Sequence, residues 1–359
     1  MTQFPNPYES LPDNAFWRTG VSSKNALSIS GLWRPKHALG KNHKISTAGS
    51  CFAQHIGKAL SRNGYSWHDA EPAPEGFDDQ LAKDYNYGIF SFRTGNIYTT
   101  AALLQWVTWA LDLATPPDEV WEKDGRFYDP FRPAIEPNGF ASPDEMFASR
   151  QATLKAIRHA IEDTNRFVFT LGLTEAWLNR AGGYTYAMCP GTLAGSYDPE
   201  LHAFQNYRFV DVLRDLKQAI RHMRAANPAL RFLLTVSPVP LTATASGEHV
   251  LAATTYSKSV LRAVAGEAAA TIQAVDYFPS YEIITAPAFR GMFYEPNLRS
   301  VHPAGVDFVM TSFFECLRAS RPNNTPSKPV KPVVARQPEQ DPDDDLVCEE
   351  VMLDSFRRI

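Results

Sequence analysis

Two almost continuously apolar runs, separated by an amphipathic segment, limit most strongly what this chain can fold into. Residues 166–173 and 231–236 have the pattern of strands that are buried on both faces. Between them, residues 204–226 carry apolar side chains at helical spacing. A strand, a helix and a second buried strand in succession imply a right-handed crossover and parallel pairing. We therefore predict an α/β fold: a three-layer α/β/α sandwich in which helices cover both faces of a mostly parallel sheet.

The same patterns predict the other members of the sheet and its helices. One parallel sheet is expected to contain residues 44–48, 167–171, 233–236 and 272–275. Helices are expected at residues 52–63, 100–113, about 143–163, 204–226, 249–269 and 304–319. The acidic, proline-containing residues 67–84 are expected to form a loop.

Composition divides the chain into an arm, a globular domain and a tail. Residues 1–42 combine prolines with aromatic residues and are predicted to be an irregular arm that packs on the main body. Residues 43–319 form the predicted globular domain. An inserted region at about residues 115–143, with a small hairpin, interrupts that domain.

The tail, residues 320–359, is rich in proline and acidic residues and is predicted to be disordered. Within it, residues 347–359 mix apolar and charged side chains, as a short docking helix does. Removal of everything after Ala319 is expected to leave the fold and any esterase activity unchanged, because such a composition buries too little apolar surface to offset ordering entropy.

The overall composition excludes several classes of protein. A formal net charge of −4 over 359 residues gives no sign of nucleic-acid binding. The four cysteines form no CxxC pair, so neither a thiolate zinc site nor another metal or cofactor is expected. The start of the chain is polar rather than signal-like, and the most apolar helix candidate, residues 101–113, is too short to span a bilayer. We expect a soluble, cytoplasmic protein without disulfides.

The turn Gly49-Ser50-Cys51 joins the first predicted strand to the first predicted helix. Such a turn lies at the carboxyl edge of the sheet, where open α/β folds bind their ligands. The positive end of the helix dipole would lower the pKa of a thiol there, which makes Cys51 the leading nucleophile candidate. In the alternative interpretation, Ser50 only caps the helix and Cys51 packs as a small buried apolar residue.

A nucleophile needs a base and donors for the developing oxyanion. His302, in the loop before the last helix, is the best candidate base, whereas His55 shares a helix face with Cys51 and is ranked as structural or auxiliary. The candidate donors and pocket residues follow strands or lie in a glycine-containing loop: Gly88, Thr174, Glu175 and Ser237. Thr174 has the alternative role of a helix cap, and Cys189 is expected at most to line the site.

Four segments resemble the GSCFA-domain family. The string Gly49–Ala53 is its signature, and residues 169–177, 235–241 and 277–282 are similar to further parts of it. That family is similar to the SGNH/GDSL hydrolases. The resemblance implies a flavodoxin-like SGNH-hydrolase fold over the globular domain, and ester or acyl-transfer chemistry.

The hydrolase pattern places Cys51 where those enzymes have their serine nucleophile, with Ser50 as the alternative. The second conserved segment of those hydrolases contains a glycine, which Gly88 or, less well, Gly95 matches here. Thr174 replaces their oxyanion asparagine. The base matches His302, so the resemblance implies a Cys-His pair.

One part of that pattern is missing. An arginine, Arg299, stands where the orienting acid is expected, and Glu295 is the only substitute in the same loop. A thiolate depends less on such an acid than an alkoxide does, so the departure fits a thiol mechanism or a lost activity.

Two hypotheses follow. In the first, the chain is an esterase or an O-acyltransferase that acts on a small-molecule or glycan acyl ester, with an acyl thioester as a further donor and polysaccharide precursors as acceptors. In the second, it is a non-catalytic carbohydrate-binding or scaffold module that kept the fold.

Overall fold

The structure of the chain is a computed structural model that describes residues 6–320, 352–353 and 356. Its contacts form two compact units. The sheet unit consists of residues 39–278 together with Met352, Leu353 and Phe356, and the helical unit consists of residues 6–38 and 279–320. Each unit is described by itself.

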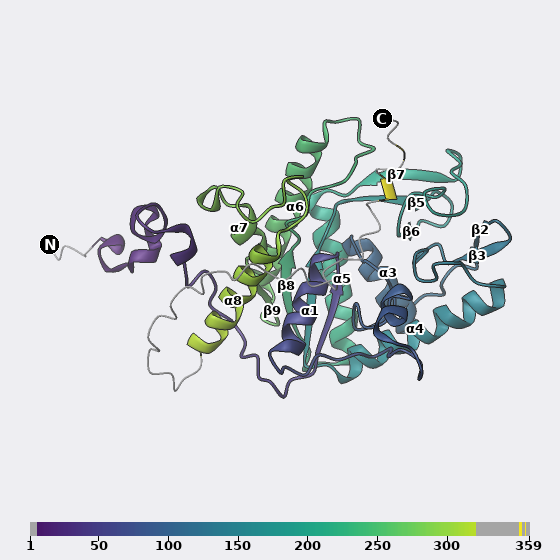
Figure 1. Cartoon of the computed structure of the whole chain (residues 1–359), viewed down its shortest axis with the longest axis horizontal. Coiled ribbons are helices and arrows are strands. Elements are labelled where there is room, and N and C mark those ends of the chain that lie inside the picture. The colour runs from purple at the N-terminus through teal and green to yellow at the C-terminus, as the bar shows by residue number, and fades with distance from the viewer. Residues whose placement is uncertain (1–5, 321–351, 354–355, 357–359) are drawn as a thin grey trace. The chain divides into compact units, whose positions relative to one another are not determined.

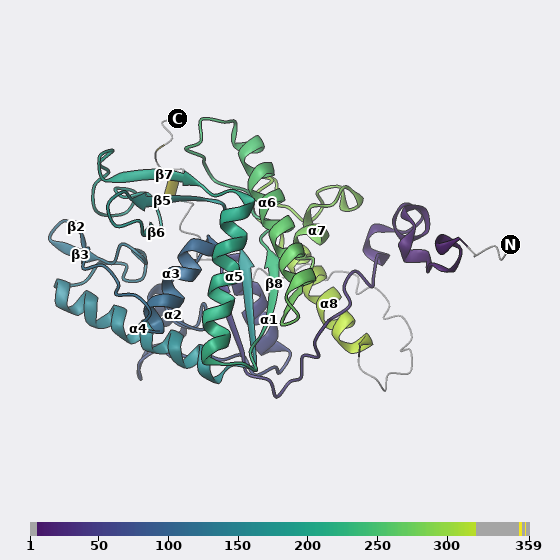
Figure 2. The ribbon, with the colours of Figure 1, turned by 180° about the vertical axis from the view of Figure 1, so that it is seen from behind.

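The sheet unit is built on one four-stranded parallel sheet, with the strand order β1-β4-β8-β9 (Figure 1). These strands are β1 (Ile45–Gly49), β4 (Arg166–Leu171), β8 (Arg231–Val236) and β9 (Val275–Tyr277). The central strands are buried on both faces, as their continuous apolar sequence requires. Figures 1 and 2 show α1 (Phe52–Arg62) on one face of the sheet and α5 (Phe209–Ala226) with α6 (Val250–Thr271) on the other. The predicted α/β fold is confirmed.

Three further helices belong to this unit: α2 (Asp79–Asp84), α3 (Thr100–Ala110) and α4 (Pro143–Asp163). Helix α4 begins where the sequence predicts, because the Ser142 hydroxyl accepts the Glu145 N–H at 3.2 Å and Pro143 occupies the first helical position. Helix α2 lies in a segment that was expected to be a loop, and Asp78 caps it by accepting the Leu81 N–H.

A second sheet, three-stranded and antiparallel, was not predicted. It consists of β5 (Glu175–Asn179), β6 (Thr185–Tyr186) and β7 (His202–Asn206), in the order β6-β5-β7. The prediction of a helix from residue 204 is therefore wrong at its start. Trp177 and Phe204 face each other across β5 and β7, with ring centroids 5.7 Å apart. This cross-strand pair decides the local structure against helical propensity.

The last strand of the parallel sheet is shorter than predicted. The strand was expected over residues 272–277, with 272–275 in the sheet, but β9 begins at Val275. The backbone N–H of Ile272 still donates to the Ala268 carbonyl, so the end of α6 takes up the residues that were expected to open the strand.

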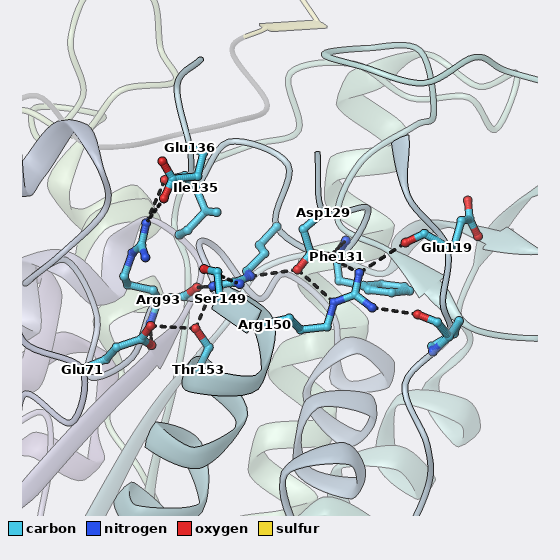
Figure 3. Close-up of polar contacts among 12 residues, drawn as sticks. Glu71, Arg93, Glu119, Asp129, Phe131, Ile135, Glu136, Ser149, Arg150 and Thr153 are labelled. Atoms are coloured by element: carbon cyan, nitrogen blue, oxygen red, sulfur yellow. Dashed lines mark hydrogen bonds and ion pairs between the residues drawn. The ribbon is translucent and has the colours of Figure 1, made fainter. Parts of the chain in front are cut away.

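The inserted region forms the predicted hairpin, β2 (Trp121–Lys123) with β3 (Arg126–Tyr128), and is held by buried charges. Asp129 lies between Arg132, at 2.9 Å, and Arg150, at 2.8 Å, and none of these side chains is exposed to solvent by more than 2% (Figure 3). Arg150 also donates to the carbonyls of Pro117 and Glu119. The network therefore ties the inserted region to α4.

The helical unit contains the short turns η1 (Pro7–Ser10), η2 (Asp13–Ala15), η3 (Arg18–Ser22), η4 (Ala26–Ser28) and η5 (Pro287–Phe289), with α7 (Ser280–Thr285) and α8 (Pro303–Ala319). Part of the predicted arm packs here: Trp33 stacks on Phe313 of α8 at 5.3 Å. Tyr8 and Trp17 are 68% and 69% exposed, so the expectation that the arm buries its aromatic residues fails for these two. Residues 321–351, 354–355 and 357–359 of the predicted tail lie outside the described residues.

We predict that Asp129→Asn lowers the free energy of unfolding by about 3–5 kcal/mol, because it leaves two buried guanidinium groups without their carboxylate. Burial alone would raise the pKa of Asp129, but Arg150 and Arg132 outweigh it and hold that pKa below its usual value. The stabilisation is therefore present above the pKa of the unfolded chain and is lost as the pH falls through the folded value.

The matched control is Asp163→Asn, which removes the exposed ion pair with Lys44 at 3.0 Å. That change is expected to cost about 0–1 kcal/mol. Urea unfolding at pH 7 measures both variants, and equal losses would contradict the role assigned to the buried network.

Candidate functional site

The turn after β1 is shaped by the close approach of two strands. Gly49 has φ of 128°, and a Cβ at this position would lie 2.4 Å from the Thr170 carbonyl oxygen of β4. No other residue fits there without a shift of the backbone. The next residue, Ser50, donates its backbone N–H to the same Thr170 oxygen at 3.0 Å. Cys51 then starts α1 as its N-cap, at the carboxyl edge of the sheet, as predicted.

Ser50 does not cap the helix. The prediction that its hydroxyl bonds a free N–H of α1 is wrong: the Ser50 Oγ is buried and has no hydrogen-bond partner among the described residues. The side chain lies against Gly172, where an added Cβ would come within 2.9 Å of the Ser50 Cβ and 3.1 Å of Tyr98 Cδ1. Ser50 is therefore packed into the edge of the sheet with an unused hydroxyl.

Cys51 and His55 are both buried, at 3% and 7% exposure. The His55 ring packs edge-on against Phe52 at 5.5 Å, within the same helix. This packing fits the structural role preferred for His55. The nucleophilic role of Cys51 stays a prediction.

Buried polar groups fix the segment after β4. Gly172 donates its N–H to the Tyr98 carbonyl at 3.1 Å, and its own carbonyl accepts from the Lys258 ammonium at 2.7 Å. Ser257, the neighbour of Lys258 on α6, accepts the Thr174 N–H at 3.1 Å. Lys258 is only 2% exposed. Sequence reasoning missed this positive charge at the sheet edge, because a lysine in an amphipathic helix is normally a surface residue.

Thr174 and Ser237 lie at the edge but are used by the protein itself. The Thr174 hydroxyl donates to Asn206 Oδ1 at 2.7 Å, so in this structure it is not available to an oxyanion. Thr174 precedes β5, and its alternative role as a helix cap is wrong. Ser237 donates its N–H to the Leu171 carbonyl, and its hydroxyl accepts the Val239 N–H, which fits a residue that shapes the loop.

Gly88 and Gly95 are the two candidates for the glycine of the second conserved hydrolase segment, and the structure favours Gly95 for that position. It is buried, and it lies two residues before Ile97, whose N–H donates to the Gly49 carbonyl at 2.8 Å. The Gly95 N–H itself donates to no other described residue. Gly88 is exposed, and a Cβ built on it would meet nothing within 4 Å. The exposed position of Gly88 favours Gly95 as the matching glycine, and the role of either as an oxyanion donor stays a prediction.

His302 belongs to the helical unit and Cys51 to the sheet unit, so their pairing stays a prediction. His302 is the N-cap of α8, and its Nδ1 accepts the Ala304 N–H at 3.1 Å. A neutral ring in this position carries its proton on Nε2. The Glu295 carboxylate makes no hydrogen bond or ion pair with the described residues, so its role as an orienting acid stays a prediction.

A pocket of about 570 Å³ opens in the sheet unit between the second sheet, α3 and the loop after β8. Tyr98, which contacts Gly172 beside Ser50, also lines this pocket. Neither Ser50 nor Cys51 is part of the lining. Most of its walls are aromatic or aliphatic: Tyr98, Trp106, Phe131, Leu173, Trp177, Tyr186, Met188, Tyr197, Phe204, Leu241, Leu353 and Phe356.

A carboxyl group, that of Glu175, and a thiol group, that of Cys189, both line the pocket. Burial raises the pKa of the Glu175 carboxyl, although the Thr244 hydroxyl, which donates to it at 2.7 Å, and the Ala245 N–H oppose that effect. Burial also raises the pKa of the Cys189 thiol, to about 11. Glu175 lines this pocket, while its predicted place in the catalytic site stays a prediction, and Cys189 lines the pocket as a poor nucleophile.

The part of the chain that the structure describes holds no group of three or more His, Cys, Asp or Glu side chains arranged for a metal ion. None of the helices in residues 6–320 combines the length and apolar character that crossing a bilayer requires.

Comparison with known proteins gives one strong match. The GSCFA family model matches residues 44–313. No curated protein matches this chain. A similar solved structure, described as that of "a putative platelet activating factor from Streptococcus pneumonia", is 14% identical with a TM-score of 0.28, and the match covers 47% of this chain and 65% of that one.

We predict that Glu175→Gln changes how stability depends on pH. A carboxyl whose folded pKa is raised stabilises the folded state below the unfolded pKa, about 4.3, and this contribution is lost as the pH rises through the folded value. The variant should therefore gain melting temperature relative to the native chain between pH 4 and pH 7. Exposed Glu248, changed to Gln, is the control and should show no such trend. Parallel Tm curves for Glu175→Gln and the native chain would contradict this account.

Proposed function

Because the chain belongs to the GSCFA family, we propose that it is an acyl-transfer enzyme whose nucleophile lies on the Gly49-Ser50-Cys51 turn. The observation that carries the proposal is this turn. The contact of Gly49 with Thr170 holds a hydroxyl and a thiol side by side at the carboxyl edge of a parallel sheet. Folds of this class bind their substrates at that edge.

In the proposed reaction, the Cys51 thiolate attacks the acyl carbonyl of an ester and forms a C–S bond. The C–O bond to the alcohol then breaks, and the alkoxide leaves with a proton. Water or a sugar hydroxyl next attacks the acyl-enzyme, loses its proton, and releases the thiolate. The position of Cys51 at the start of α1 favours the thiolate, because the first N–H groups and the dipole of the helix stabilise an anion.

Ser50 is the second candidate nucleophile, and one observation favours it: its buried Oγ has no partner among the described residues. In either case, we assign the oxyanion to the Gly95 N–H and the first N–H groups of α1 rather than to the Thr174 hydroxyl. His302 remains the proposed base, and to act as one it must release the Ala304 N–H from its ring.

The pocket of about 570 Å³ beside the second sheet, called the aromatic pocket below, supports an acyl ester or glycan as substrate. Trp177 packs edge-on against Tyr197 at 5.3 Å and against Phe204 at 5.7 Å, which presents flat apolar surfaces to a sugar ring or an acyl chain. Glu175 and Thr244 add polar atoms at the same wall. This combination of apolar walls and a few polar groups is typical of small-molecule sites. With water as acceptor the enzyme is an esterase, and with a sugar hydroxyl it is an O-acyltransferase.

A non-catalytic carbohydrate-binding module is the second candidate function. The observation in its favour is that the Thr174 hydroxyl, in the place of the oxyanion asparagine, is engaged by Asn206.

We predict that Cys51→Ala lowers the hydrolysis rate of a fluorogenic acetyl ester by about 10³-fold or more, because a missing nucleophile removes the covalent step. Ser50→Ala should retain part of the rate. Cys189→Ala, the matched control in the pocket wall, should leave kcat within a few-fold of the native value.

A fully active Cys51→Ala with an inactive Ser50→Ala would assign the nucleophile to Ser50. If neither change alters the rate, or if the native chain does not turn the ester over, the enzyme proposal fails. Glycan binding without turnover would then support the second candidate.

A further inference from the structure

The described residues at the C-terminal end of the chain lie at the aromatic pocket. Leu353 and Phe356 are part of its lining, although the sequence separates them from α8 by more than 30 residues. Figures 1 and 2 both draw this segment, in yellow, beside β5 and β7. The same segment clusters with the sheet unit and not with the helical unit that precedes it in the chain.

The two tail residues contact the pocket differently. Leu353 is half-buried, whereas Phe356 is 62% exposed. Met352, the neighbouring residue, is 37% exposed and does not line the pocket. A spacing of three residues between two apolar anchors is the spacing of side chains that enter a groove from one turn of a helix.

We propose that the aromatic pocket is a binding site for the chain's own C-terminal segment, anchored by Leu353 and Phe356. The apolar side chains of Leu353 and Phe356 match the aromatic walls of this pocket, which include Trp177, Tyr197 and Phe204. This inference concerns the occupant of the pocket and does not depend on the proposed reaction.

If the pocket also takes the acyl substrate, the segment competes with it. In that case the segment raises KM in the native chain and leaves kcat unaltered. Loss of residues 320–359 would then increase the rate at low substrate concentration, against the expectation of unchanged activity.

Cys189, in the pocket wall, reports whether the segment is in place. We expect iodoacetamide at pH 8.5 to alkylate Cys189 about tenfold faster in the full-length double variant Leu353→Asp/Phe356→Asp than in the native chain. A tenfold difference corresponds to a pocket that the segment occupies about 90% of the time in the native chain. Met352→Asp is the matched control and should label at the native rate. Cys316, buried in the helical unit, should not change in any variant.

A synthetic peptide of residues 343–359, added to the double variant, should restore the protection of Cys189. The same peptide with both aspartate substitutions should not. Equal labelling rates in the native and double-variant chains, or no protection by the native peptide, would overturn the proposal. If the protection of Cys189 in the native chain disappears on dilution, the pocket binds the segment of a second copy, and the proposal is also overturned.

Discussion

The close approach of β1 and β4 at Gly49 is the constraint on which the candidate site depends. A side chain at this position would lie 2.4 Å from the Thr170 carbonyl oxygen, so the two strands reach this separation only through glycine. The same Thr170 oxygen then accepts the Ser50 N–H, and the Gly49 carbonyl accepts the N–H of Ile97. Three segments far apart in sequence are thereby joined around two nucleophilic side chains. Substitution of Gly49 would therefore displace the turn, the neighbouring strand and Gly95 together.

A second set of interactions holds the opposite side of that edge. Lys258 and Ser257, on one turn of α6, bind the backbone of Gly172 and Thr174. The Lys258 ammonium group is buried, and its bond of 2.7 Å to the Gly172 carbonyl fixes the segment after β4 to α6.

The parallel sheet, the hairpin of the inserted region and the strand-to-helix turn could be predicted from the sequence. Their signals are local: continuous apolar runs, a Lys-Asp-Gly turn, and glycine before a helix start. The second sheet could not be predicted, because β7 depends on Phe204 meeting Trp177 across a separation of 27 residues, which no local pattern reveals. The aromatic pocket, which residues of this second sheet help to line, was missed for the same reason.

For the candidate site, the sequence predicted the Gly49-Ser50-Cys51 turn at the carboxyl edge of the sheet, but not the hydrogen-bond partners that decide which polar groups are available. Thr174 is taken by Asn206, and Ser50 is left without a partner among the described residues. Both outcomes depend on residues brought close only by the fold. Lys258 was missed because a lysine is normally a surface residue, whereas its ammonium group donates to the Gly172 carbonyl after β4.

Peptide mapping of the acyl-enzyme tests the central claim most directly. The native chain is treated with an activated acyl ester, stopped in acid, digested and analysed by mass spectrometry. The account predicts one acyl group on the peptide that contains residues 49–52, attached as a thioester to Cys51 and released by neutral hydroxylamine. Acylation that spreads over surface lysines, or that leaves this peptide unmodified while the ester is turned over, would contradict it.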